Sequence, residues 1–312
     1  MASGTALNVV NWVGASLSIV VFAARAWTRF FIVRSIGLDD LLMFISLLAS
    51  LAAAGLITAS VHYGMGSETE GSILASKYSF LSGIPVLIAQ AIGRISFAFT
   101  LLSILGITMV RRWFLFAIIG LQVVFLVVDL ALSYGLCSPV SVFWNSTLPE
   151  AQVCLAKYHT VVVDGWNYFQ TAWDVLTDFS LALFPALIFK SMNMQMRLKI
   201  GMIILMGLGV LTGICAIVKS VEFASLFSNT KNSNYAQATI FIWTVVQQYI
   251  VIIASSVPYC LCLFRKQGNR TIGSSNQTGA YTYGRITLKP KPYKHQAEDL
   301  SRQNFIQLDS QK

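Results

Sequence analysis

Two carboxylates interrupt an apolar stretch long enough to cross a bilayer. Asp174 and Asp178 lie within the segment 164–190, and because they are four positions apart, both project from one face of a helix. Three further polar side chains extend that face: Asn167, Gln170 and Thr171. A carboxylate in mid-membrane costs about 2.5–3.5 kcal/mol on insertion scales. We therefore expect this face to contact protein rather than lipid.

Asp174 and Asp178 are candidate catalytic residues, with a structural role as the alternative. Like charges one turn apart disfavour double ionisation, so a dry cavity could hold one carboxyl protonated. A protonated carboxyl can act as a general acid towards an epoxide or alkene. In the structural alternative, both side chains only clamp neighbouring helices by hydrogen bonds. The sequence leaves both roles open.

Other apolar segments also contain polar side chains that need partners inside a bundle. Two are cations, on different segments, that could pair with any of the three carboxylates; which pairs form stays open. A salt-bridged core without further function is the alternative. The candidate ligand-binding or ion-pair residues are Arg94, Asp129, Lys219, Trp243 and Gln247.

The composition is that of a multi-pass membrane protein. Of 312 residues, 55% are hydrophobic and 11% charged, with a mean hydropathy of +0.66. Five cysteines and three histidines show no metal-binding spacing, so no metal is expected. No phosphate loop or hydrolase triad is present, and we expect neither a cofactor nor a nucleic-acid partner. The expected surroundings are the lipids of the plasma membrane or an endomembrane.

Seven segments are long enough to span the membrane, given that about 20 apolar residues suffice. They predict an all-α, seven-transmembrane helix bundle over residues 1–264. Residues 265–312 lack apolar periodicity and are predicted to form a disordered, basic cytosolic tail. The predicted spans are 6–27, 40–62, 82–109, 113–135, 162–189, 200–226 and 236–264.

Basic residues alternate between the connections in a way that predicts orientation. The first, third and fifth connections, counted with the adjoining helix ends, contain eight Lys and Arg, whereas the opposite connections contain three. The positive-inside rule then places the N-terminus outside and the C-terminus inside.

One loop on the predicted outer side contains two further signals. Cys137 and Cys154 are predicted to form a disulfide, as expected for an oxidising compartment. Between them, Asn145-Ser146-Thr147 is a glycosylation sequon, which makes Asn145 a candidate glycosylation site.

Taken together, these marks resemble the fungal rhodopsin-like domain family, seven-helix integral membrane proteins of the satratoxin-cluster type and of a receptor-like type. The resemblance covers about residues 10–265. The matching marks are Asp39-Asp40 after an Arg-rich connection, Gly64-Met65-Gly66, Arg94-Ile95-Ser96, Cys137-Ser138-Pro139 with Trp144 and Cys154, Asp174 with Asp178 and Pro185, Lys199, Lys219, and Trp243 with Pro258.

Two positions depart from the family pattern. Glu68 stands where a His is usual, and Gln247 lies near the place of a Glu, which puts roles of those groups in doubt. Retinal is not expected, because a Schiff base needs a Lys on the last helix and the span 236–264 has none. Lys219 is on the preceding helix, towards its outer end.

The resemblance implies a membrane component of a fungal secondary-metabolite pathway that binds, and by acid catalysis could act on, a lipophilic intermediate. The alternative is a GPCR-like receptor, which seven helices, an outer disulfide and a basic tail also suit. Against a receptor, Asp-Arg-Tyr is absent from the third helix and Asn-Pro-x-x-Tyr from the seventh. A transporter is disfavoured because no internal repeat is evident.

The orientation can be tested by tagging each end of the chain and applying protease to sealed vesicles. We expect the N-terminal tag to be outside and the C-terminal tag to be cytosolic, because of the asymmetry in basic residues. A C-terminal tag on the lumenal side would overturn the assignment of every loop.

Overall fold

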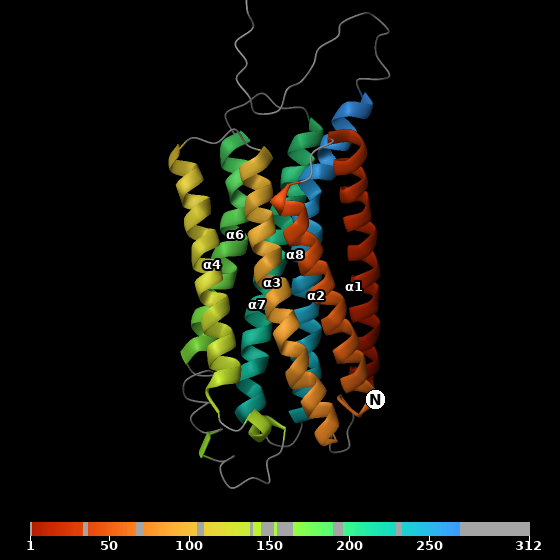
Figure 1. Cartoon of the computed structure of the whole chain (residues 1–312), viewed down its shortest axis with the longest axis vertical. Helices are drawn as coiled ribbons and strands as arrows, with labels where there is room; N and C mark the ends of the chain where they lie inside the picture. The colour runs from red at the N-terminus through yellow and green to blue at the C-terminus, as the bar shows by residue number, and fades with distance from the viewer. Residues whose placement is uncertain are drawn as a thin grey trace, which may run out of the picture. The chain divides into compact units, whose positions relative to one another are not determined.

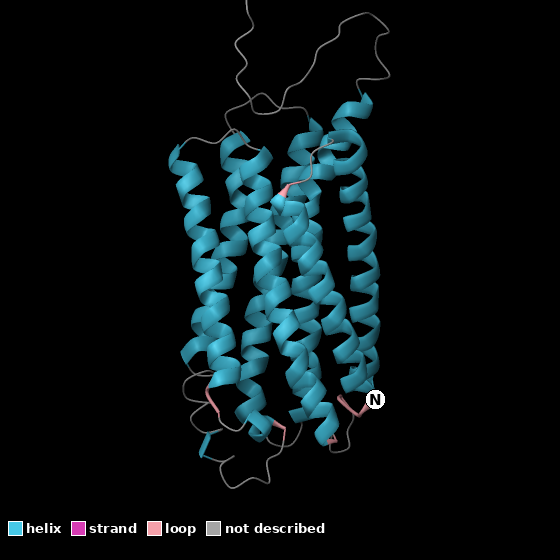
Figure 2. Cartoon of the chain, viewed as in Figure 1, coloured by secondary structure: helices cyan, strands magenta, loops and turns pink. Residues whose placement is uncertain are grey.

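The computed structural model describes residues 2–33, 37–66, 72–104, 109–137, 140–144, 153–154, 165–189, 196–228 and 233–268. These residues form seven long helices and no strands (Figures 1 and 2), as the seven predicted segments indicated. A π-helical turn, η1 (Thr28–Val33), continues the first helix, and a 3-10 turn, η2 (Val140–Phe143), follows the fourth. The helices are α1 (Ala2–Trp27), α2 (Leu38–His62), α3 (Ile73–Ile104), α4 (Met109–Gly135), α6 (Asn167–Phe189), α7 (Met196–Ser228) and α8 (Ser233–Gly268).

Six of these helices are long and apolar enough to cross a membrane, which indicates a multi-pass membrane protein. The six spans are Gly4–Phe31, Leu38–His62, Ile73–Ser103, Met109–Gly135, Ile203–Phe223 and Ala236–Val257. The remaining helix, α6, has 23 residues and is the helix that contains Asp174 and Asp178. At 1.5 Å per residue it is about 35 Å long, which exceeds the hydrocarbon thickness of about 30 Å.

Helix α3 is the centre of the bundle. It contacts α2, α4, α6 and α8 (Figure 1). In the most apolar 18-residue stretch of α3, 67% is buried, against 22% for the corresponding stretches of α1 and α4. One apolar cluster joins α1, α2 and α8 through side chains that include Leu7, Met43, Ile57 and Tyr249. A second joins α3, α4, α6, α7 and α8 through side chains that include Phe97, Leu115, Leu181, Leu205 and Ala254. Polar residues on α3 are therefore enclosed by protein.

The predicted start of the third span at residue 82 was wrong, because α3 begins at Ile73. The hydroxyl of Ser72 accepts a hydrogen bond from the backbone N–H of Ala75 at 3.2 Å, which is N-cap geometry. A search for apolar runs misses these first turns because they include Lys77, Ser76 and Ser79. The missed turns matter, since they form part of the cavity wall described below.

Two glycines make the turn between α2 and α3. Gly64 and Gly66 have φ values of 105° and 79°, a left-handed conformation that L-residues with a side chain rarely adopt. A Cβ atom on Gly66 would also lie 2.7 Å from the backbone nitrogen of Gly4. Glycine is thus required here both for the turn and for the close approach of α1.

The predicted disulfide is confirmed. Cys137 and Cys154 are joined, with their Cα atoms 5.9 Å apart. Cys137 follows α4, which ends at the end of the bundle where α1 begins (Figure 1). Asn145, the candidate glycosylation site, lies outside the described residues.

Removing the disulfide should lower the free energy of unfolding by about 3 kcal/mol, because the bridge closes a loop of 17 residues. Cys137→Ser and Cys154→Ser should each lower the melting temperature of the purified protein as much as the double variant does, since all three changes break one bond. Double-variant effects equal to the sum of the single effects would contradict this.

Candidate functional site

Arg94 of α3 joins two carboxylates of α6 inside the bundle. Its Nη1 donates to Asp174 Oδ1 at 2.7 Å, its Nε to Asp178 Oδ1 at 2.9 Å and its Nη2 to Asp178 Oδ2 at 3.3 Å. All three side chains are buried, with at most 5% exposed. The i, i+4 spacing on α6 presents both acids to one guanidinium, so Asp178 is held at two points and Asp174 at one.

A cavity of about 630 Å³ extends from this ion cluster to the end of the bundle that contains η2. Residues from α3, α4, η2, α6, α7 and α8 line it. Its deep part is reached by Arg94 and Asp174, and its outer part by residues from the helix ends, including Ser76, Tyr134, Phe143, Trp166 and Gln237. The wall mixes aromatic rings with amides, hydroxyls and charges, which is the lining typical of a small-molecule site.

Asp129 of α4 lines the same cavity and accepts a hydrogen bond from the indole Nε1–H of Trp166. Trp166 belongs to an aromatic group in which the ring centroid of Phe125 lies 5.9 Å from that of Trp166 and 4.7 Å from that of Trp173. Trp173 in turn donates to Gln122 Oε1 at 3.3 Å. Aromatic packing between α4 and the start of α6 therefore fixes the indole against the carboxylate.

Lys219 of α7 also lines the cavity. Its Nζ lies 4.0 Å from Asp174 Oδ2, the outer limit of an ion pair. The other oxygen of Asp174 already accepts from Arg94 at 2.7 Å and from Gln170 Nε2 at 3.4 Å. Asp174 Oδ2 is therefore the more accessible oxygen for a ligand that donates a hydrogen bond.

Four of the predicted residues line the main cavity and three do not. Arg94, Asp129, Asp174 and Lys219 all line the cavity. Asp178 lies behind Arg94 and lines only a smaller pocket. The two candidates on α8, Trp243 and Gln247, are not among the lining residues of either space.

Several lining residues were not singled out in the sequence. Trp166 was missed because an aromatic residue near a helix end is typical of a membrane interface. Gln90, Gln122 and Thr244 were missed because single amides and hydroxyls within apolar segments gave no repeat or spacing to follow. The clearest available signal was the density of aromatic and amide residues at the start of α6.

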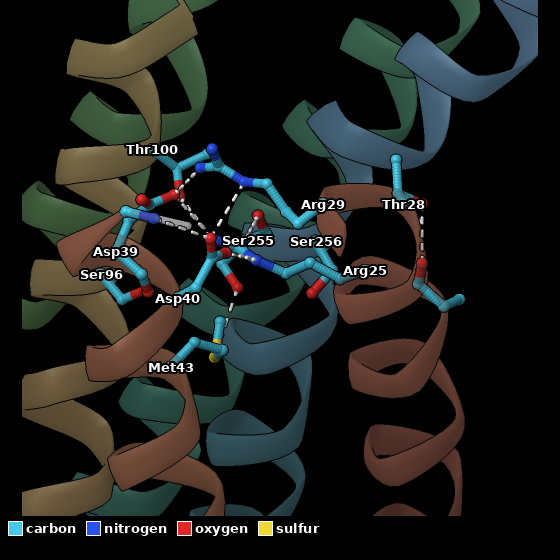
Figure 3. A network of polar contacts seen from close by, with 12 residues as sticks. Arg25, Thr28, Arg29, Asp39, Asp40, Met43, Ser96, Thr100, Ser255 and Ser256 are labelled. Carbon is cyan, nitrogen blue, oxygen red and sulfur yellow. Dashed lines mark hydrogen bonds and ion pairs between the residues drawn. The ribbon is translucent and has the colours of Figure 1, made fainter. Parts of the chain in front are cut away.

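A second ion network lies at the other end of the bundle (Figure 3). Arg25 of α1 is fully buried and pairs with Asp39 at 2.9 Å and Asp40 at 3.0 Å. It also donates to Thr100 Oγ1 of α3 at 3.0 Å and to the backbone carbonyl of Ser255 on α8 at 2.8 Å. One guanidinium thus connects α1, α2, α3 and α8.

The remaining contacts in Figure 3 complete this network. Arg29 pairs with both Asp39 and Asp40, and Ser96 Oγ donates to the backbone carbonyl of Asp39 at 2.6 Å. Asp40 also accepts from the backbone N–H of Gly37 at 3.2 Å, which caps α2. Asp40 therefore caps the helix, both aspartates hold the arginines, and none of these residues lines the cavity.

Among the described residues, no group of three His, Cys, Asp or Glu side chains is placed to hold a metal ion. The chemistry that the site offers is recognition by ion pairing, hydrogen bonding and aromatic contact.

Seven helices, six of them long and apolar enough to cross a membrane, form a bundle with a polar, aromatic-lined cavity bordered by buried ion pairs. The family model for the fungal rhodopsin domain matches residues 24–266, so the chain belongs to this family. A relative in Metarhizium anisopliae, the "Polyenoic acids biosynthesis gene cluster protein Ba17b", is 22% identical over 297 residues. The alignment covers 89% of this chain and 78% of that protein.

The two carboxylates of α6 should contribute unequally to stability. Asp178→Asn should lower the free energy of unfolding by about 2–3 kcal/mol, because two charge-assisted hydrogen bonds from Arg94 are affected. Asp174→Asn should cost about 1 kcal/mol, since one such bond is affected and Gln170 and Lys219 lie nearby.

Thermal unfolding of both variants in the same detergent checks this order. Thr171→Ala, on the same helix, provides the control for changes that leave Arg94 paired. Equal losses in the two Asn variants would contradict the two-point attachment of Asp178.

Proposed function

We propose that the protein is a membrane component of a fungal secondary-metabolite pathway and binds a lipophilic intermediate in the cavity of α3, α4, α6, α7 and α8. The observation that carries this proposal is the cavity itself, whose volume of about 630 Å³ falls within the range of about 300–1,000 Å³ of small-molecule sites. Its polar groups are concentrated at Arg94, Asp174, Lys219 and Asp129, and apolar and aromatic side chains form much of the wall.

The pathway assignment is supported by the relative from Metarhizium anisopliae, whose name places it in a biosynthetic gene cluster for polyenoic acids. At 22% identity that name supports the kind of pathway in this proposal and says nothing of the compound. The ligand class consistent with both observations is a lipophilic small molecule that enters from the bilayer or the aqueous edge.

The proposed topology places the cavity mouth on the outer or lumenal side. The start of α1 and the end of α4 share one end of the bundle, and α4 begins at the other end (Figure 1). The disulfide and the cavity-lining Phe143 follow the end of α4 in the sequence, and Arg111 and Arg112 lie in its first turn. This agrees with an N-terminus outside and a C-terminus inside. The membrane is the plasma membrane or an endomembrane of the secretory route.

The ligand in this proposal is not retinal. A retinal Schiff base needs a Lys on the last helix, and the span 236–264 contains none; Lys219, which lines the cavity, is on α7. Added all-trans-retinal should therefore give no stable visible absorption band with the purified protein.

A GPCR-like sensor is the second candidate, favoured by the position of the two polar sites. The cavity opens towards the proposed outer side, whereas the network of Arg25, Arg29, Asp39 and Asp40 lies at the opposite end. A receptor would need such a separation between ligand site and inner face. The gene's neighbourhood discriminates the two, since adjacent biosynthetic enzymes favour the pathway role.

Replacement of Asp174 in the native host tests the proposed function. Asp174→Asn should lower the pathway's product at least tenfold at normal protein abundance, because a hydrogen bond to a charged group contributes about 1.5–3 kcal/mol. A fall of 10²-fold or more would indicate that Asp174 also acts as a general acid. Metabolite profiles of extracted cultures, compared with a gene deletion, provide the measurement.

Asp178→Asn is the matched control for that experiment. It removes the same charge from the same helix, but Asp178 does not line the main cavity. Product per molecule of inserted protein should stay close to wild type. A normal metabolite profile in the Asp174 variant, at normal abundance, would defeat the proposal that Asp174 serves the ligand.

A further inference from the structure

We infer that the cavity takes a lipophilic molecule that contains a protonated amine, with Asp129 as the anion that receives it. This inference rests on the proposed function, because it specifies the ligand of the same cavity. It begins from the distribution of charge among the described residues that line the cavity or lie directly behind it.

Three carboxylates and two cations make up this charge cluster: Asp129, Asp174, Asp178, Arg94 and Lys219. Arg94 pairs with Asp174 and Asp178, and Lys219 lies within ion-pair distance of Asp174 only. One negative charge is left without a counter-ion. A buried carboxylate in a bundle that spans a membrane is stabilised by a cation or a set of donors, so the excess charge favours a positively charged ligand.

Asp129 is the carboxylate that lacks the counter-ion. Its side chain is buried and lines the cavity, and the indole N–H of Trp166 is its hydrogen-bond donor in the described structure. No cation among the described residues lies within ion-pair distance of it. Asp174, by contrast, has Arg94 at 2.7 Å and Lys219 at 4.0 Å.

The surroundings of Asp129 are also suited to an ammonium group. Trp166 lines the cavity beside Asp129, and Tyr134 and Phe80 line it as well. Aromatic faces attract cations through the ring quadrupole, and Trp does so most strongly. A carboxylate in a cavity whose wall contains aromatic rings therefore offers an amine a charge-assisted hydrogen bond and, where a ring face is within reach, a cation–π contact.

The same arrangement disfavours a free carboxylate in the ligand. Lys219 could pair with it, but Asp174 lies 4.0 Å from that ammonium and Asp129 shares the cavity. An acid would therefore enter a site with a net negative charge, whereas an amine would neutralise it. The apolar part of either molecule would contact the same wall.

Three probes with one decyl chain separate these cases: decylamine, decanol and decanoic acid. Binding is measured with the full-length protein in lipid nanodiscs, and empty nanodiscs give the background from partition into lipid. We expect the amine to bind at least about tenfold tighter than the alcohol and the acid, the factor of one charge-assisted hydrogen bond.

Two variants assign the effect to named residues. Asp129→Asn should weaken amine binding at least about tenfold, while its retained binding of decanol shows that the cavity is still folded. Lys219→Met should instead strengthen amine binding and weaken binding of the acid, because it removes a positive charge from the cavity. Asp129→Glu, which keeps the charge, should recover most of the affinity for the amine.

Several outcomes would overturn the inference. One is tighter binding of decanoic acid than of decylamine, lost in Lys219→Met, and another is amine binding that Asp129→Asn leaves unchanged. Equal binding of the alcohol and the amine would reject the amine inference but leave the lipophilic-ligand proposal standing. If none of the three probes binds the protein nanodiscs more than it binds empty nanodiscs, both the amine inference and the lipophilic-ligand proposal are rejected.

Discussion

Arg94 donates hydrogen bonds to two carboxylates of one helix, and removing Arg94 would leave both carboxylates without this cation inside the bundle. This constraint explains why α3 is central and why α6 can cross a bilayer with two aspartates. The guanidinium needs protein on every side, and the carboxylates need to face it rather than lipid. The packing of α4, α7 and α8 around α3 follows from enclosing that cluster.

The cavity is a consequence of the same arrangement. Helices that carry charged and amide side chains on their inner faces cannot close tightly over one another, because long polar side chains occupy the space between them. At the deep end the polar groups satisfy one another through Arg94, and towards η2 they are more loosely paired, with aromatic rings between them. The polar groups of the site are therefore paired with one another at its floor and separated by aromatic rings towards its mouth.

The sequence was sufficient for the helix count, the disulfide and the polar face of α6, since each depends on local spacing or on a short loop. Hydrophobic runs identified the spans, but they did not reveal the first turns of α3, which are polar and capped by Ser72. The partner of Asp174 and Asp178 could not be chosen, because Arg94 is 80 and 84 residues away and Lys219 was an equal candidate.

Other parts of the site depend on tertiary packing that no local pattern encodes. Asp129 was expected in an ion pair and instead accepts from Trp166, a contact between α4 and the start of α6. Gln247 was a candidate for the ligand site, yet its fully buried amide has no hydrogen-bond partner among the described residues. Whether Gln247 faces the cavity depends on the rotation of α8 about its own axis. The neighbouring helices set that rotation.

The position of α3 has a mechanical consequence. The helix supplies Arg94 to the ion cluster at the cavity and, six residues further on, Thr100 to the arginine network of Figure 3. At 1.5 Å per residue the two attachments are about 9 Å apart on one stiff rod. Sliding that rod along its axis would stretch the hydrogen bonds of both attachments together, so the two networks jointly hold α3 at one axial position.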